Sequence, residues 1–203
     1  MQYQEFCDRL GFIVSRETFA RLETYAALLE KWQNTINLVS KSTLADLWQR
    51  HFLDSAQLYP LVKDTDGILA DIGSGAGFPG LVLSILGKGD VHLVESDIRK
   101  AVFLREVARS CDASVHVHAC RIEEAPVQDA AVVTARALAA LPQLLDYTAP
   151  LLKGGGICVF LKGRIVDEEI TTAQKDWEFS VEKQGSITGD EGVVLVLRDV
   201  VRK

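Results

Sequence analysis

The sequence predicts an α/β fold, a doubly wound and mostly parallel sheet with a helical N-terminal cap. Two observations support this fold class. From residue 68 onward, short apolar runs alternate with helical segments, which is typical of buried parallel strands joined by helices. Before that point, apolar residues recur at helical spacing. A chain of 203 residues suits one domain with a modest extra element.

Two helices are expected in the N-terminal region. The first covers 16–38, with Ser15 as a candidate N-cap, and its apolar face consists of Phe19, Leu22, Ala26, Leu29 and Ile36. The second covers roughly 43–60 and closes at Pro60. We therefore divide the chain into a helical region, 1–62, and an α/β domain, 63–203, which together form one compact unit.

The α/β domain is expected to contain strands and helices in alternation. The predicted strands are Ile68–Ile72, Val91–Glu95, Ser114–His118, Ala130–Thr134, Ile157–Leu161 and Val193–Leu197. Helical segments are predicted at 79–86, 98–110, 120–125 and 137–152. The stretch from Gly185 to Gly192 predicts a turn-rich connection into a last, antiparallel strand.

Composition limits the classes of function. The formal net charge is −6, which argues against broad non-specific binding of nucleic acid but leaves room for a local basic face. No apolar run approaches the ~20 residues that span a bilayer, and the first ten residues contain Glu5, Asp8 and Arg9 in place of a signal-peptide core. We expect a cytoplasmic protein without a membrane partner.

Metal binding is not expected. The four cysteines form no Cys-x-x-Cys pair, and reduced structural thiols are the simplest interpretation. His116 and His118 share one face of a predicted strand, but no third ligand lies near them in the sequence.

The stretch from Asp71 to Gly80, Asp-Ile-Gly-Ser-Gly-Ala-Gly-Phe-Pro-Gly, predicts a cofactor loop between a strand and a helix. Its glycines, Gly73, Gly75 and Gly77, allow the backbone to approach a ligand closely. The stretch also matches the dinucleotide signature G-x-G-x-x-G. S-adenosylmethionine (SAM) is favoured for two reasons. Asp71 would repel a pyrophosphate, but beside SAM it can orient the loop or meet the cationic methionyl ammonium, and 151–160 resembles the late helix, glycine turn and strand of class I methyltransferases.

Two further segments fit the rest of such a cofactor. Glu95 ends the second strand, where a carboxylate accepts hydrogen bonds from ribose hydroxyls. A solvated acid at the strand end is the simpler alternative. Ile122 and Glu123 follow the third strand, where an adenine ring would lie between an apolar side chain and polar edge contacts.

The chain resembles the bacterial 16S rRNA guanine-N7 methyltransferases, the RsmG or GidB family. The segments that carry the resemblance are Lys31-Trp32, Asn37-Leu38, Ser40, 50–55 (Arg-His-Phe-Leu-Asp-Ser), 71–80, Glu95-Ser96, Arg99-Lys100, 103–105, 121–124, Arg136-Ala137 and 161–163. The resemblance implies a seven-stranded, Rossmann-like class I fold and SAM contacts from Gly73, Phe78, Ile122, Glu123 and Arg136. It also implies S-adenosylhomocysteine as product and 16S rRNA, in the 30S subunit or an assembly intermediate, as partner. Nothing demands more than a monomer.

The chemistry of guanine N7 needs no general base, because the atom already carries an in-plane lone pair. We therefore assign no catalytic residue and expect catalysis by alignment of N7 with the methyl group. Asn37, His51 and Asp54 are candidates for lining the target pocket. His51 and Asp54 lie three residues apart on one helical face, so a structural brace is equally consistent.

Basic residues gather at the expected carboxyl edge of the sheet, where α/β folds bind ligands. The candidates for RNA binding are Arg99, Lys100, Arg121, Arg136, Lys162 and Arg164. For Arg99 and Lys100, on the helix after Glu95, the alternative interpretation is a solvated charged face.

Two other functions stay open: a class I methyltransferase acting on a protein or small molecule, and, more distantly, an NAD-dependent oxidoreductase.

Overall fold

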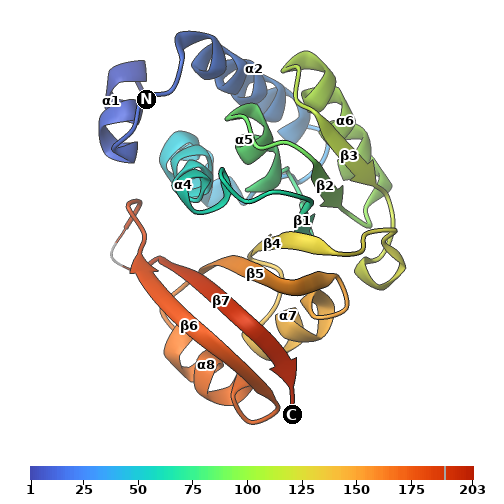
Figure 1. Cartoon of the computed structure of the whole chain (residues 1–203). Coiled ribbons are helices and arrows are strands. Elements are labelled where there is room, and N and C mark those ends of the chain that lie inside the picture. The colour runs from blue at the N-terminus through green and yellow to red at the C-terminus, as the bar shows by residue number, and fades with distance from the viewer. Residues whose placement is uncertain (190) are drawn as a thin grey trace.

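A computed structural model describes residues 1–189 and 191–203 and contains one seven-stranded sheet (Figure 1). The strand order is β3-β2-β1-β4-β5-β7-β6, with parallel pairing from β3 to β5 and antiparallel pairing of β7 with both β5 and β6. The predicted fold class is confirmed. The strands are β1 (Leu69–Ile72), β2 (Val91–Val94), β3 (Val115–His118), β4 (Ala130–Arg136), β5 (Leu152–Lys162), β6 (Trp177–Gly185) and β7 (Val193–Arg202).

Strand β6 was not among the predicted strands, and its sequence explains why. It is an edge strand, and of its residues only Trp177 is buried. A strand that packs so little apolar surface lacks the continuous hydrophobic run by which buried strands are recognised. The sequence therefore predicted only the turn-rich connection from Gly185 onward, and Gly185 is the residue at which β6 ends.

Helices cover both faces of the sheet. On one face α5 (Gly80–Ile85) and α6 (Ile98–Ser110) contact β2 and β3, and α2 (Arg16–Gln33) packs on both helices as an outer layer (Figure 1). On the other face α7 (Leu141–Thr148) and α8 (Val166–Ala173) pack against each other in a second core with β4, β5 and β7. The first core runs continuously from Phe6 to strand residues such as Val132, so the N-terminal region and the α/β domain share it.

The prediction of one helix over 16–38 was wrong at its end and missed α1 (Tyr3–Leu10). Ser15 is the N-cap of α2, as expected, and its hydroxyl accepts a hydrogen bond from Thr18 N at 3.0 Å. The helix ends at Gln33, whose side chain is bonded to the following loop. Its Oε1 accepts from Leu38 N and Val39 N, both at 3.0 Å, and its Nε2 donates to Val39 O. These bonds satisfy loop amides that a longer helix would have bonded internally.

The prediction of one helix over 43–60 was also wrong. The segment consists of a 3-10 turn (Lys41–Thr43), a π-helical stretch (Trp48–Leu53), α3 (Asp54–Ala56) and α4 (Tyr59–Val62). Pro60 lies in the first turn of α4 instead of closing a helix, because a first-turn residue needs no N–H partner. The π-helical stretch directs His51 toward the cleft described below.

Three smaller corrections concern loops at the carboxyl edge. Pro79 is the N-cap of α5 and not its first residue. The helix predicted over 137–152 shortens to α7, since Ala137 adopts a left-handed φ of 52° that no α-helix allows. The predicted 120–125 helix is a single 3-10 turn, Ile122–Glu124. Among the described residues, the helices are all too short or too polar to cross a bilayer.

Candidate active site

A cleft of about 1130 Å³ opens at the carboxyl ends of the parallel strands. Seven of the nine predicted cofactor residues line it: Gly73, Gly75, Phe78, Glu95, Ile122, Glu123 and Arg136. So do His51 and Asp54, from the N-terminal region, and Lys100, Arg121, Lys162 and Arg164, from the predicted RNA set. The volume exceeds the ~300–1,000 Å³ of ordinary ligand pockets, which leaves room for a cofactor and a second molecule.

The glycine loop has a backbone that only glycine adopts easily. Gly73 has a φ of +62°, and a Cβ on it would lie 2.6 Å from Leu138 Cδ1. Leu138 follows β4, so the loop after β4 closes directly over Gly73. Gly77 has a different role: its missing side chain makes room for Leu81 and for the Tyr25 hydroxyl, and Gly77 does not line the cleft.

Tyr25 supports the loop from α2. The ring is fully buried and stacks on Phe78, with centroids 5.2 Å apart, and its hydroxyl donates to Ala76 O. Burial raises the pKa of Tyr25 well above its usual value, so the hydroxyl keeps its proton as a donor. The residue was not among the predicted site residues, because at the sequence level it is one more apolar position of an amphipathic helix.

We expect Tyr25→Phe to lower the free energy of unfolding by about 1–2 kcal/mol, since Ala76 O loses a buried donor. It should also weaken binding of SAM, the expected cofactor. Tyr3→Phe is a matched control, because the Tyr3 hydroxyl donates to Val14 O at 2.8 Å away from the cleft. Urea unfolding and calorimetric titration with SAM measure both effects. An unchanged SAM affinity in Tyr25→Phe would show that the bond does not shape the loop.

Asp71 lies beneath the loop and not in the cleft. It is fully buried, and its Oδ1 accepts from Thr134 Oγ1 at 2.7 Å, while Ser74 Oγ donates to its backbone carbonyl. Burial raises the pKa of this carboxyl to about 6, against the lowering effect of the Thr134 hydroxyl. Of the two predicted roles, orientation of the loop fits this position. Direct contact with a methionyl ammonium does not, since Asp71 does not line the cleft.

The raised pKa gives a pH-dependent difference between the wild type and Asp71→Asn. The unfolded carboxyl titrates near 3.8 and the folded one near 6, so the folded state binds the proton more tightly. The stability that this proton contributes is present below pH 3.8 and is lost as the pH rises through 6. Between pH 3.8 and 7 the wild type should therefore lose on the order of 3 kcal/mol relative to Asp71→Asn. Urea unfolding at several pH values measures the difference, and a constant difference would contradict the shift.

Glu95 braces the loop from the end of β2. One carboxylate oxygen accepts from Gly75 N at 2.8 Å and the other from Asp97 N at 2.7 Å. The side chain is 8% exposed and lines the cleft, so the alternative of a solvated acid does not fit. Each carboxylate oxygen retains acceptor capacity toward a bound hydroxyl.

Arg136 joins the two halves of the cleft. From the end of β4, its guanidinium donates to Arg50 O at 2.9 Å and to His51 Nδ1 at 2.6 Å, and it lies 5.1 Å from the centroid of the Phe78 ring. Since arginine only donates, His51 Nδ1 is the acceptor and the ring proton is on Nε2, which donates to Thr43 Oγ1 at 2.8 Å. Burial, with Arg136 and Arg50 nearby, lowers the pKa of His51 to about 3 and keeps it neutral.

Asp54 fastens the hairpin loop between β6 and β7 to the cleft. Its Oδ1 accepts from Gln57 Nε2 at 2.9 Å and from Thr188 Oγ1 at 3.0 Å, and its Oδ2 lies 3.6 Å from Arg136. Ser186 Oγ donates to the same Oδ1 at 3.3 Å. His51 and Asp54 both line the cleft, and both also brace it. They do so through Arg136 and the hairpin, because the described contacts include no bond between His51 and Asp54.

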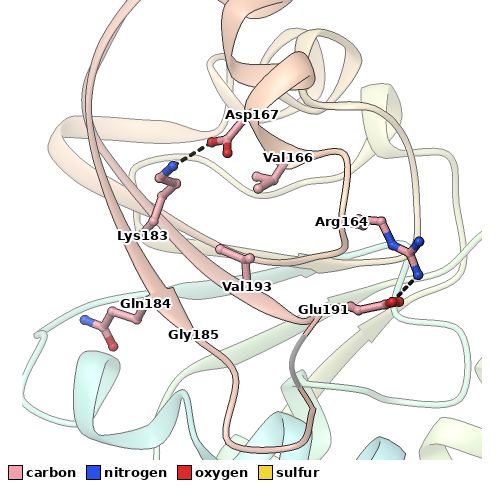
Figure 2. A pocket seen from close by; sticks show the side chains of 8 residues that line it. All are labelled: Arg164, Val166, Asp167, Lys183, Gln184, Gly185, Glu191 and Val193. Carbon is pink, nitrogen blue, oxygen red and sulfur yellow. Dashed lines mark hydrogen bonds and ion pairs between the residues drawn. The ribbon is translucent and has the colours of Figure 1, made fainter.

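The other basic candidates divide by their partners. Lys162 is 9% exposed, forms an ion pair with Glu169 at 2.5 Å and donates to Ala139 O, so it holds the loop after β4. Arg164 is exposed and paired with Glu191 at the rim of an adjacent hollow, where Lys183 also pairs with Asp167 (Figure 2). Arg121 is exposed on the cleft wall.

Asn37 and Arg99 lie apart from His51 and Asp54. Both line a smaller polar hollow of about 310 Å³ beside the cleft, together with Lys100, which borders both spaces. Arg99 is exposed and paired with Asp97 at 2.8 Å. The structure therefore places Asn37 with the basic start of α6 and not in the wall formed by His51 and Asp54.

Fold and cleft together define the class. A seven-stranded sheet with β7 antiparallel, a glycine loop after β1 and an acid after β2 is the architecture of class I methyltransferases. Two methyltransferases are among the solved structures that share it. Ribosomal protein L11 methylase of Lactobacillus delbrueckii subsp. bulgaricus has a TM-score of 0.61 at 15% identity and covers 73% of this chain and 79% of its own. A TehB-like SAM-dependent methyltransferase of Corynebacterium glutamicum has a TM-score of 0.56 at 18% identity and covers 91% and 99%.

Sequence comparison identifies the family. The family model for rRNA small subunit methyltransferase G (GidB) matches residues 18–193. The ribosomal RNA small subunit methyltransferase G of Paramagnetospirillum magneticum is 54% identical over 189 residues, which cover 93% of this chain and 92% of the relative. The chain belongs to the rRNA small subunit methyltransferase G family, which confirms the resemblance carried by its motifs.

Proposed function

We propose that this protein transfers the methyl group of SAM to N7 of a single guanine in 16S rRNA, within the 30S subunit or an assembly intermediate. The observation that carries the proposal is the single cleft, in which a glycine loop of cofactor type faces a target wall from the N-terminal region. Family membership supports small-subunit rRNA as the substrate.

The donor half of the cleft fits SAM. Gly73 and Gly75 offer a backbone free of side chains. Glu95, bonded to Gly75 N, offers carboxylate oxygens as acceptors for the ribose hydroxyls. Ile122 and Glu123 supply an apolar surface and a polar edge for adenine. When bound, SAM supplies an electrophilic methyl group. The chain's own residues hold that group in place and shield it from water.

The target half of the cleft fits a nucleophile that needs no deprotonation. His51 is neutral, and both of its ring nitrogens already have hydrogen-bond partners. The carboxylate of Asp54 takes three donors and faces Arg136, and Glu169 is paired with Lys162. Because these groups are occupied, abstraction of a proton by them is not favoured, whereas N7 of guanine attacks through its own lone pair.

The charge around the target half suits the product. Methylation at N7 leaves a cationic ring, which a strongly positive pocket would oppose. The charge of Arg136 is offset by Asp54 at 3.6 Å, and that of Lys162 by Glu169. Arg121, Lys100 and Arg164 also line the cleft, and Arg121 and Arg164 are exposed, so we expect these cations to contact the phosphate backbone and not the base.

Transfer of labelled methyl from SAM to 30S subunits that lack the modification tests the proposal. The modified base is located by strand cleavage specific for N7-methylguanine. We expect cleavage at one guanine and inhibition by S-adenosylhomocysteine. We also expect one copy of the protein per particle, because we propose that it acts as a monomer in the cytoplasm. Naked 16S rRNA is the parallel substrate, and a preference for particles would support recognition of their shape. Label in ribosomal protein, or at several guanines, would overturn the proposal.

A further inference from the structure

Three of the four histidines of the chain gather on one face of the sheet, away from the cleft described above. The parallel register places His92 of β2 directly beside His116 of β3, and His118 follows on the same face. The sequence offered only His116 and His118, without a third ligand. The neighbouring strand supplies that ligand, and a 24-residue separation in sequence concealed it.

The distances among these groups suit one metal ion. His92 Nε2 lies 3.2 Å from Asp90 Oδ1, and the His92 and His116 rings have centroids 4.7 Å apart. The ligand atoms of Asp90, His92 and His116 all lie within 4.8 Å of one another. Two ligands of a tetrahedral zinc ion, each about 2.0–2.1 Å from the metal, are about 3.3 Å apart. Small side-chain rotations would therefore place all three around one ion.

His118 has the position of a supporting residue. Its Nε2 lies 3.0 Å from His92 Nδ1, on the side of the ring away from Asp90. A histidine that binds metal through one nitrogen commonly donates its other N–H to a nearby acceptor, which fixes the ring. Without a metal ion, the Asp90 carboxylate only accepts, so His92 Nε2–H donates to it and His92 Nδ1 accepts from His118 Nε2. In the other tautomer, with Nδ1–H donated to His118, His92 Nε2 would present a lone pair beside the Asp90 carboxylate. Two acceptors that face each other in this way are suited to a shared cation.

Access to this face is open. Leu93 and Val117 point into the core beneath α5 and α6, so the alternating histidines point to the opposite face. There the connection from β3 to β4 contains only the 3-10 turn Ile122–Glu124 among its described elements. His92 is 14% exposed and Asp90 50% exposed, which leaves room for a water molecule as fourth ligand.

We propose that Asp90, His92 and His116 form a site for one zinc-type divalent ion, with His118 as the residue that orients His92. Imidazole and carboxylate ligands suit Zn²⁺ and its spectroscopic substitute Co²⁺. The ion would fasten β3, an edge strand that pairs only with β2, to the rest of the sheet. Because β3 leads into the cleft residues from Cys120 to Glu123, the bound ion would support that wall of the cleft.

Titration of the metal-free full chain with Co²⁺ and Zn²⁺ tests the site. We expect one equivalent to bind, with visible Co²⁺ absorption bands of a four-coordinate site that Zn²⁺ abolishes. Saturating Zn²⁺ should raise the melting temperature by about 5 °C, because the ion binds only the folded state. His116→Gln and Asp90→Asn should each weaken binding at least about 100-fold, and His118→Gln about 10-fold.

The controls separate this site from other ligands and from misfolding. Cys120→Ser should bind metal like the wild type, because the thiol lies outside the ligand set. Circular dichroism of each variant without metal, and SAM titration of His116→Gln, Asp90→Asn and His118→Gln, confirm that the fold is intact. Binding that survives both His116→Gln and Asp90→Asn, or that disappears in Cys120→Ser, would overturn the proposal. So would zinc binding without any Co²⁺ spectrum or thermal shift in the wild type.

Discussion

Replacing Arg136 with lysine should lower kcat/KM for methyl transfer about 100-fold, although the charge is kept. The guanidinium bonds Arg50 O and His51 Nδ1 with separate nitrogens while it lies over the Phe78 ring. An ammonium is a single point donor and cannot make this set of contacts. Loss of one hydrogen bond to a charged group costs about 1.5–3 kcal/mol, and misalignment of the target wall reduces the rate further. Steady-state kinetics on 30S subunits measures the loss.

Arg105→Lys is the matched control for this experiment. Arg105 is exposed on α6, donates to Val117 O at 3.1 Å and does not line the cleft. It should keep activity within about twofold of the wild type. SAM affinity in Arg136→Lys tells which half of the cleft is affected: a large fall in kcat with a small change in SAM affinity indicates the target wall. Full activity of Arg136→Lys would show that the charge alone suffices.

Gly73→Ala should weaken SAM binding strongly: we expect the dissociation constant to increase at least about 30-fold. The backbone has a φ of +62°, which costs an alanine about 1–2 kcal/mol. The new Cβ would in addition lie 2.6 Å from Leu138 Cδ1, so the loop after β4 must move. That movement disturbs both sides of the donor pocket, because Gly73 and Leu138 both line the cleft.

Gly89→Ala is the control for Gly73→Ala. A Cβ on Gly89 meets no atom within 4 Å, and its backbone is not in the left-handed region. Its stability and SAM affinity should match those of the wild type. Calorimetric titration with SAM and thermal melting compare the two variants. If both bind SAM equally well, the loop does not depend on close approach at Gly73.

The sequence predicted the elements whose signals are local. Short apolar runs identified five parallel strands and β7. The signal was clearest for β1 and β4, which bury nearly all of their residues and need no partner to be recognised. The glycine loop was equally clear, because the left-handed φ at Gly73 is a property of the residue itself. The acid after β2 followed from its place at a strand end.

The errors arose where side chains bond across long distances in the sequence. Gln33 ends α2 because its side chain bonds the loop that follows, and the spacing of apolar residues does not reveal such bonds. Asp54 was assigned to the pocket or to a brace with His51, but its partners Ser186 and Thr188 lie more than 130 residues away. Lys162 was expected to meet phosphate, whereas the ion pair with Glu169 turns it inward.

The sequence by itself determined the class of fold, the cofactor loop and the family, because strand burial, glycine conformation and motif order are encoded over short stretches. Only the tertiary structure decided which side chains share a site. It brought Arg136 to His51, Tyr25 beneath the glycine loop, and His92 beside His116. The reason is physical: hydrogen bonds, ion pairs and metal ligands act over a few ångströms in space, and the register of the sheet sets those distances.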